Sequence, residues 1–466
     1  MAKGLVNERR VLTDSLPTVV GWVVGEPLTP VWAFANHTPM QQAQQPLISW
    51  KRNLAVLWLA GTCVAIGFTF SFPFMPLFLQ DMGLAQGGRA ALWSGIIQVS
   101  MGVGMVLSGP VWGLAADRYG RKKNVVRAMF GGGAFMLLSA FSTSLYHLII
   151  LRFLTGVSTG SMGPSMALLA STTPRERIPF AIGILQTSFF VGNTIGPFLG
   201  GLVADSWGLK GTFLATGTML GVGGVIALLL AREEFHRPSQ SVSIFQRRAY
   251  ANLLRLLTSR ELKPVLTVVF SVQVLPIMTF TVLPLILDDL SSMGGGSVTG
   301  VAFGVMGLAG GLGSYLAGQL SGRVSSMRIL RMAVVGAALS FAPLAVANSV
   351  GLFYLFLGLG GAFQGSMIAM TGGLVALAVS GEEQGVAFGG LQAVQVSAFS
   401  IGPLVGGGIG ATAGLRWVFP VQTFGLLALS VAMARLLPGE AVSGLQRAVA
   451  TTAEADGQAD SDRAPD

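Results

Sequence analysis

Residues 183–201 read GILQTSFFVGNTIGPFLGG, and residues 389–407, which lie 206 positions later, read GGLQAVQVSAFSIGPLVGG. Both stretches contain Gly-Pro followed, after two residues, by Gly-Gly. Two further matches have nearly the same offset: GSM at 160–162 recurs at 365–367, and PLFLQD at 76–81 recurs as PLILDD at 284–289. A nearly constant offset predicts an internal duplication rather than a chance likeness between Gly-rich segments.

The composition of the chain is typical of a membrane protein. Of its 466 residues, 52% are hydrophobic and only 11% are charged, against about 25% charged residues in soluble domains. Glycine, with 64 residues, is frequent in membrane helices because it lets helices approach closely. Lys and Arg exceed Asp and Glu by 29 to 20. They lie between apolar runs, which indicates membrane topology rather than nucleic-acid binding.

Apolar runs long enough to cross a bilayer predict twelve transmembrane helices. The first six are expected at 54–79, 91–115, 125–143, 146–170, 180–204 and 212–231. The second six are expected at 263–287, 298–321, 329–347, 351–379, 385–411 and 415–437. The predicted fold is therefore an all-α membrane protein whose twelve helices form two pseudo-symmetric six-helix bundles, related by an axis along the membrane normal.

Polar stretches set the expected domain limits. Residues 1–50 are predicted to be a poorly ordered N-terminal extension, and Met40 is an alternative start that would leave residues 1–39 outside the native protein. The remaining limits are an N-terminal six-helix bundle at 51–231, a cytoplasmic linker at 232–262, a C-terminal bundle at 263–437 and a cytoplasmic tail at 438–466.

Basic residues are distributed unevenly over the loops. The even-numbered loops hold 17 of them: five after span two, two after span four, seven in the central linker and three after span eight. The odd-numbered loops hold Arg89, Lys210 and Arg416. Because short basic loops stay in the cytoplasm, we expect both termini there, in a multi-pass protein of the cell membrane, or of the inner membrane in a Gram-negative source. The loop after span ten is the exception, since it holds Glu382 and Glu383 without a basic residue.

The loop after span two reads GLAADRYGRK from 113 to 122 and is a candidate conformational latch. Its glycines permit a tight turn, and its carboxylate can bind the N-terminal N–H groups of a helix or pair with Arg. The loop resembles the signature loop of the major facilitator superfamily, which implies a cytoplasmic latch between the halves when the protein opens outward. The candidate residues are Gly113, Asp117, Arg118, Gly120 and Arg121. Gly322 stands at the Asp position in the second half, so the latch is expected to be one-sided.

Span five carries a longer pattern, made of Gly183, Gly192, Gly196, Pro197, Gly200 and Gly201. Glycine at every fourth position lines one helix face and permits close packing, while proline removes a backbone hydrogen bond. The pattern resembles the antiporter motif of drug:proton exporters at each Gly and Pro position. Over about residues 51–437, the resemblance implies a twelve-span bacterial multidrug exporter that works by alternating access. Generic packing of small residues is the alternative, but it needs no pattern of this length.

Span four contains Arg152 within LIILRFLTG, residues 148–156. The segment resembles the fourth-helix motif of the superfamily, with Thr155 in place of the usual Gln. A charge inside the bilayer costs at least about 3 kcal/mol, so a functional role is expected, with snorkelling to the outer interface as the alternative. No Asp or Glu lies in the middle of a predicted span, so proton coupling lacks an obvious carboxylate. The acids expected nearest in depth to Arg152 are Asp81, Asp288 and Asp289.

Uncharged polar residues within the spans are candidates to line an adaptable apolar cavity, although simple helix packing is the alternative for each. They are Gln98, Gln186, Asn193, Gln273, Gln364, Gln392 and Gln395. The leading function is export of small amphipathic or hydrophobic compounds by a monomer in exchange for protons. A transporter of a polar metabolite, such as a sugar or an organic anion, is the alternative. One Cys, three His and the lack of catalytic motifs predict no metal site, no cofactor and no enzymatic activity.

Overall fold

A computed structural model describes residues 49–174, 177–233, 262–291, 295–377 and 384–436. All of its helices belong to one compact unit, Ile48–Asp466. Nearly all of the predicted N-terminal extension, most of the linker and the predicted tail lie outside the described residues.

The first half of the chain forms helices whose bounds follow the predicted spans. They are α1 (Trp50–Ser71), α2 (Met75–Asp81), α3 (Gly87–Tyr119), α4 (Arg121–Ser139), α5 (Leu145–Ser158), α6 (Met162–Thr172) and α7 (Ile178–Leu230). Span one is divided into α1 and α2, and span four into α5 and α6. Spans five and six run together as α7, which is interrupted at Gly208, where φ is 73°.

The second half repeats this order. Its helices are α9 (Leu262–Ile277), η3 (Met278–Thr281), α10 (Leu283–Leu290), α11 (Gly295–Leu320), α12 (Ser326–Phe341), η4 (Ala342–Ala345), α13 (Val350–Leu377), α14 (Gln384–Thr412), η5 (Leu415–Trp417) and α15 (Val418–Leu436). Span seven is divided like span one, about 208 positions later. Span ten is a single helix, α13, although span four is broken.

Nine helical segments of the described chain are long and apolar enough to cross a membrane. One of them covers residues 180–230, which hold the two spans that meet at Gly208. The spans at α4 and at the α5–α6 pair fall outside the nine because α4 begins with a cluster of charged residues and α5 and α6 are short. With these included, the twelve predicted spans are all accounted for, and the described residues form no strand.

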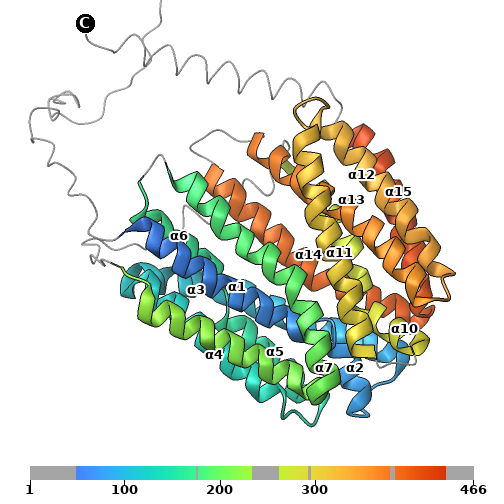
Figure 1. The fold of residues 1–466 in the computed structure, drawn as a ribbon, viewed down its shortest axis with the longest axis horizontal. Coiled ribbons are helices and arrows are strands. Elements are labelled where there is room, and N and C mark those ends of the chain that lie inside the picture. Colours follow the sequence, from blue (N-terminus) through green and yellow to red (C-terminus); the bar gives the residue numbers. More distant parts are fainter. Residues whose placement is uncertain (1–48, 175–176, 234–261, 292–294, 378–383, 437–466) are drawn as a thin grey trace, which may run out of the picture. The chain divides into compact units, whose positions relative to one another are not determined.

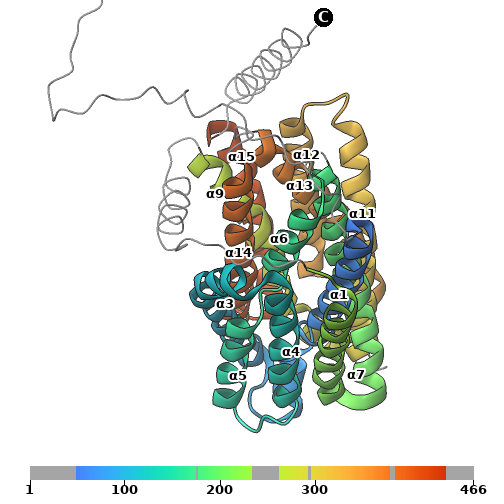
Figure 2. The same cartoon turned by 90° about the vertical axis from the view of Figure 1, so that its left-hand side faces the viewer.

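The two halves form separate helix groups that meet along two helix pairs. Within the first half α1 and α4 pack on α7, and within the second half α11 and α12 pack on α13. Between the halves, α3 packs on α14 and α7 packs on α11. Figure 1 shows most helices of the first half (blue to yellow-green) at the lower left and those of the second half (yellow to red) at the upper right, and in Figure 2 the first half lies nearer the viewer.

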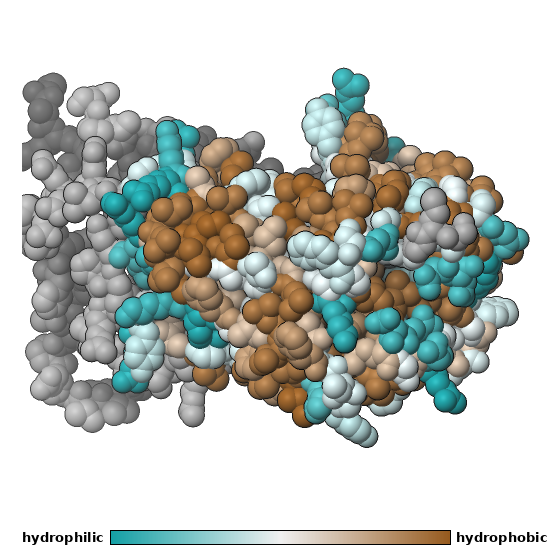
Figure 3. Space-filling model, turned by 60° about the horizontal axis from the view of Figure 1, so that its bottom comes forward, coloured by the Kyte–Doolittle hydropathy of each residue, from teal (hydrophilic) through white to brown (hydrophobic). Residues whose placement is uncertain are grey.

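The flanks of the molecule are apolar. Large side chains such as Phe141, Leu308 and Phe424 are 73%, 70% and 71% exposed, and Figure 3 shows broad apolar areas with hydrophilic side chains between and around them. Soluble proteins rarely expose contiguous apolar surface of this kind. The exposed apolar side chains therefore mark the surface that faces lipid.

Charged residues gather at the helix ends. One end, which we call the basic end, includes Lys123 in the first turn of α4, Arg323 in the α11–α12 turn and Arg328 in the first turn of α12. The other end, which we call the outer end, includes the α7 interruption with Lys210 and the turn before α13. The loops predicted to be rich in Lys and Arg thus lie at one end of the molecule, and the loops poor in them lie at the other.

The sidedness of the two ends is testable with single cysteines. In a Cys63→Ala background, Lys210→Cys should react with a membrane-impermeant maleimide on intact cells, because sparsely basic loops face outward. Lys123→Cys should react only after permeabilisation. Labelling of Lys123→Cys from outside, with Lys210→Cys protected, would reverse the assigned topology.

Candidate functional site

Glycines seven residues apart mark the face of α3 that meets the second half. A Cβ atom added at Gly88, Gly95 or Gly102 would come closer than 3.0 Å to atoms of α14. Gly109, the next in the series, has no such neighbour within 4 Å among the described residues. Because only glycine allows this backbone approach, α3 and α14 are in close contact near the outer end and diverge toward the basic end.

The α7–α11 pair behaves in the same way. A Cβ at Gly300 would lie 2.8 Å from the Pro197 carbonyl oxygen, and one at Gly307 would lie 3.0 Å from Thr194 Cα. Gly311, one turn nearer the basic end, has no described neighbour within 4 Å. We call the α3–α14 and α7–α11 contacts the two seams between the halves. Both seams are therefore closed at the outer end and part toward the basic end.

The glycines of the span-five pattern serve two different partners. A Cβ at Gly192, Gly196 or Gly200 would collide with Ala65, Thr69 or Phe70 of α1, respectively. Gly201 instead faces Gly296 and Gly300 of the other half, and Gly183 has no described neighbour within 4 Å. Pro197 lies inside α7. The predicted close packing along one face is confirmed, and it fixes span five to span one.

The second half repeats these contacts at the same offset. Gly402 and Gly406 pack against the end of α9 and against η3, and Gly407 packs against α3. Each glycine thus has the partner that the duplication assigns to it, since α9 corresponds to α1 and α3 to α11. The sequence repeat is also a repeat of helix contacts.

Four phenylalanines close the space between the seams. Phe72 of the first half stacks on Phe399 of α14, with ring centroids 4.6 Å apart, and contacts Phe280 at 5.6 Å. Phe280 in turn contacts Phe303 of α11 at 4.7 Å. Through Phe72, the rings join the two halves at the break in span one and the corresponding break in span seven.

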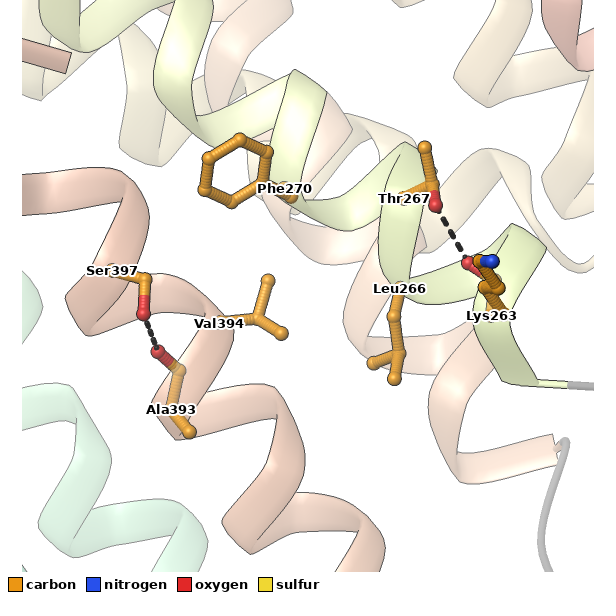
Figure 4. Close-up of a pocket in the computed structure, with 7 residues that line it drawn as sticks. All are labelled: Lys263, Leu266, Thr267, Phe270, Ala393, Val394 and Ser397. Atoms are coloured by element: carbon orange, nitrogen blue, oxygen red, sulfur yellow. Dashed lines mark hydrogen bonds between the residues drawn. The ribbon is translucent and has the colours of Figure 1, made fainter. Parts of the chain in front are cut away.

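A groove of about 350 Å³ opens between α9 and α14. Figure 4 shows its seven lining residues, and all of them come from the second half: Lys263, Leu266, Thr267, Phe270, Ala393, Val394 and Ser397. Its volume falls in the range of about 300–1,000 Å³ found for small-molecule pockets. Most of its lining is apolar, with one cation at the start of α9.

Of the seven polar residues predicted for the cavity, the six whose side chains the structure describes do not line this groove. Gln98 is 5% exposed, Asn193 is exposed, and Gln186, Gln273, Gln364 and Gln395 are half-buried. The side chain of Gln392 lies outside the described residues. Ala393 and Val394, which lie between Gln392 and Gln395 in α14, line the groove on the side that faces α9.

Arg152 is the largest fully buried side chain, 2% exposed, so it does not snorkel to the membrane surface. Its guanidinium carbon lies 5.5 Å from the centre of the Phe213 ring, and its Nε has no hydrogen-bond acceptor among the described residues. Asp81, Asp288 and Asp289 are exposed at the ends of α2 and α10. The structure describes no ion pair between Arg152 and any of them, so the expected pairing is absent from this conformation.

The candidate latch loop is shorter than the sequence predicts. Helix α3 continues to Tyr119, so Gly113 lies on an exposed face inside the helix and takes no part in a turn. Gly120 alone connects α3 to α4, with φ 107° and ψ 145°, a conformation that favours glycine. The side chain of Asp117 lies outside the described residues.

The two arginines of the loop have separate contacts. The Arg118 guanidinium lies 5.5 Å from the ring of the adjacent Tyr119. The Arg121 guanidinium donates to the carbonyl oxygen of Ala167 in α6 at 3.0 Å. Arg121 therefore joins the start of span three to span four.

Glu233 is a residue that the sequence analysis missed. Its carboxylate accepts from the backbone N–H groups of Arg121 and Lys122 at 2.8 and 2.9 Å, and so caps the N-terminus of α4. The Asn53 side chain exchanges two hydrogen bonds with the backbone of Arg232, at 2.7 and 3.0 Å. The start of the linker is thereby fixed to α1 and α4 at the basic end. In the sequence, the signal for this role is an acid two residues after a long apolar run.

A second missed feature is the break in span four. The segment between α5 and α6 includes Gly160 with φ 98°, which leaves carbonyl groups at the end of α5 without helical partners. The Trp112 indole donates to Val157 O at 2.6 Å, and the Arg127 guanidinium donates to Ser158 O at 3.0 Å. Arg127 also stacks 3.3 Å from the Trp112 ring centre. A cation near the C-terminus of a helix interacts favourably with the helix dipole. Arg127 and Trp112 therefore stabilise the break in span four.

Comparisons with known proteins agree with this geometry. A family model described as Major Facilitator Superfamily matches residues 57–351 and 297–453. Multidrug resistance protein MdtG of Escherichia coli O81 (strain ED1a) is 29% identical over 385 residues, which cover 81% of this chain and 92% of that protein. MdtG of Escherichia coli K12 (strain DH10B) is 29% identical over 383 residues, with coverage of 80% and 91%.

Two solved structures share the fold. The human organic anion transporter MFSD10 (TETRAN) covers 82% of this chain and 99% of its own, with a TM-score of 0.60 and 18% identity. A bacterial homologue of the human lysosomal transporter Spinster, in an inward-facing and occupied conformation, covers 84% and 96%, with a TM-score of 0.67 and 13% identity.

The cap on α4 is testable by its charge. Glu233→Gln removes the negative charge and one of two acceptor oxygens, so it should lower the free energy of unfolding by about 1 kcal/mol. The measurement is the thermal midpoint of the purified protein in detergent. Arg232→Gln is the matched control, because its backbone rather than its side chain makes the described bonds. Equal midpoints for the two variants would contradict the capping role.

Proposed function

The chain belongs to the Major Facilitator Superfamily, and we propose that it exports small amphipathic or hydrophobic compounds in exchange for protons by alternating access. A member of this family is a multi-pass membrane transporter and not an enzyme. The observation that carries the proposal is the span-five series, in which Gly192, Gly196 and Gly200 pack against α1 and Gly201 packs against the other half. The likeness to MdtG, a multidrug resistance protein by name, supports the same substrate class.

The proposed direction of transport rests on the two seams. In this proposal the basic end and both termini face the cytoplasm, because basic loops are retained there. The seams part toward that end, and the phenylalanines from Phe72 to Phe399 close the other. The described conformation would then admit a compound from the cytoplasm. The groove beside Phe270 would receive its apolar part.

The proposed cycle also needs a state that is closed at the basic end. We assign the latch for that state to the α3–α4 connection, with Gly113, Asp117, Arg118, Gly120 and Arg121. Its carboxylate would bind the start of span eleven, near residues 384–390, or nearby arginines, when the basic ends approach. Since the contact exists in one state only, it shifts the conformational balance rather than the fold.

Proton coupling is proposed to involve Arg152 and the acids Asp81, Asp288 and Asp289. A guanidinium does not release its proton readily, so Arg152 would hold water, a substrate oxygen or a carboxylate that arrives in another state. The absence of a mid-span carboxylate from the sequence favours coupling near the outer end, where these acids are exposed.

A second candidate is transport of an organic anion. The specific observation in its favour is that Arg152 is buried without an acid partner among the described residues. Lys263 adds a cation to the groove. An anionic group would offset the desolvation of either cation.

Proteoliposomes test both candidates. With purified protein and an imposed pH gradient, uptake of fluorescent neutral amphiphiles should rise above that of empty liposomes and fall when an uncoupler is added. Matched anionic and cationic amphiphiles discriminate the substrate class, since preference for the anion supports the second candidate. Uptake that ignores the pH gradient would exclude proton exchange, and no uptake of any compound would exclude export of amphiphiles.

Arg152 offers a test that separates function from folding. A lone buried cation destabilises the fold, so Arg152→Met should leave the thermal midpoint equal or higher. If the guanidinium acts in transport, the same variant should lose at least about tenfold in rate, equivalent to about 1.4 kcal/mol of barrier. Arg152→Lys keeps the charge but loses the planar fork, so its rate should be intermediate.

The matched control is the exposed Arg89, changed to Met and Lys in parallel, for which we expect unchanged transport. Normal transport by both Arg152 variants would show that the buried guanidinium has no part in the cycle.

A further inference from the structure

A carboxylate joins the two halves at the outer end. The backbone N–H of Ser297 donates to Asp205 Oδ2 at 2.8 Å, and a Cβ added at Gly296 would overlap Asp205 Oδ1. Asp205 lies near the end of span five, three residues before the interruption at Gly208. Ser297 is the third residue of α11, the first helix of the second half to meet α7. The other contacts described across the seams are packing contacts of glycines, of Thr194 and Ser400, and of apolar side chains.

The chemistry of this contact is that of a helix cap. The first N–H groups of a helix have no partners within the helix, and the aligned peptide dipoles favour negative charge there. Asp288, from the second half itself, accepts from the backbone of Gly295 at the same N-terminus. The N-terminus of α11 therefore keeps the Asp288 carboxylate in any arrangement of the halves, and it receives the Asp205 carboxylate only when they meet.

Like charges limit the strength of this cap. Asp289 and Asp205 both repel the Asp288 carboxylate near the start of α11, and the Asp205 side chain is exposed. An exposed charge at a helix terminus contributes a modest stabilisation. A contact of this strength favours one conformation but can still be broken by thermal motion. A gate requires both properties.

The internal repeat shows that the carboxylate is specific to one seam. The position 206 residues after Asp205 is Ala411. A Cβ at Gly88 would lie 2.8 Å from Ala411 Cα, so the corresponding seam brings the end of α14 against the start of α3 by backbone packing alone. In both seams, the end of one helix meets the start of a helix of the other half. Among the described residues, only the α7–α11 seam has an acid bound at that helix start.

We propose that Asp205 is a positioning residue that latches the outer gate in the conformation open to the basic end. Its carboxylate holds span five on span eight through the N-terminus of α11, and it releases that N-terminus when the outer seams open. It acts on the conformational equilibrium and does not touch the transported compound. The inference rests on the proposed alternating access but does not depend on proton exchange or on the identity of the substrate.

Distance measurements across the outer gate test this assignment. Spin labels at Lys210→Cys and Val346→Cys, in a Cys63→Ala background, report on the separation of the halves at the outer end in lipid nanodiscs. Asp205→Ala should raise the ratio of the long-distance to the short-distance population about threefold to tenfold, because one charged cap is lost from the short-distance state alone. Asp205→Asn should have a smaller effect, since its amide oxygen still accepts a hydrogen bond.

A second variant removes the other partner. Ser297→Pro lacks the N–H donor at a first-turn position that tolerates proline. It should produce a similar shift, and the double variant should shift no further than either single one. Ser206→Ala is the matched control, because its hydroxyl bonds only to Leu202 O within α7. An Asp205→Ala distribution equal to that of the parent, or an equal shift in Ser206→Ala, would overturn the proposal whatever the Ser297 variant does.

Discussion

Close backbone approach between glycine-lined helices is the constraint on which the rest of the structure depends. Lipid is as apolar as leucine, so helices inside it associate through van der Waals packing rather than through the hydrophobic effect. At Gly95 and Gly300 a single added Cβ would displace backbone of the opposing half. Contacts of this kind make few polar bonds, so they can separate without leaving many buried groups unpaired. The same glycines therefore join the halves and permit them to part.

The duplicated halves have diverged mainly in their polar groups. The glycine contacts of α7 and α14 repeat almost position by position, whereas Asp117 has Gly322 as its counterpart and Asp205 has Ala411. Span four is broken and held by Trp112 and Arg127, while span ten runs unbroken as α13. At the outer end, the first half supplies the Asp205 carboxylate and the second half supplies the helix N-terminus that binds it.

Arg127 and Glu233 have a common role in the first half. Arg127 bonds a carbonyl at the end of α5, and Glu233 bonds two N–H groups at the start of α4, so each offsets an unsatisfied helix terminus. Arg152 is more deeply buried than either, lies 5.5 Å from the Phe213 ring, and has no hydrogen-bond acceptor for its Nε among the described residues. Since an unpaired buried cation destabilises a fold, the proposed role of Arg152 in transport would account for its retention.

The sequence by itself determined the twelve spans, the duplication and the charge asymmetry, because hydropathy, offset and loop charge are local properties that a bilayer constrains strongly. It also predicted the turn at Gly120 and the packing face of Gly192, Gly196 and Gly200. Only the tertiary structure decided that Glu233 caps α4, that Arg152 packs on Phe213 and that Asp205 reaches Ser297. These contacts join residues far apart in the chain, and those across the seams also depend on which end of the molecule is closed. No local pattern specifies which side chains meet under those conditions.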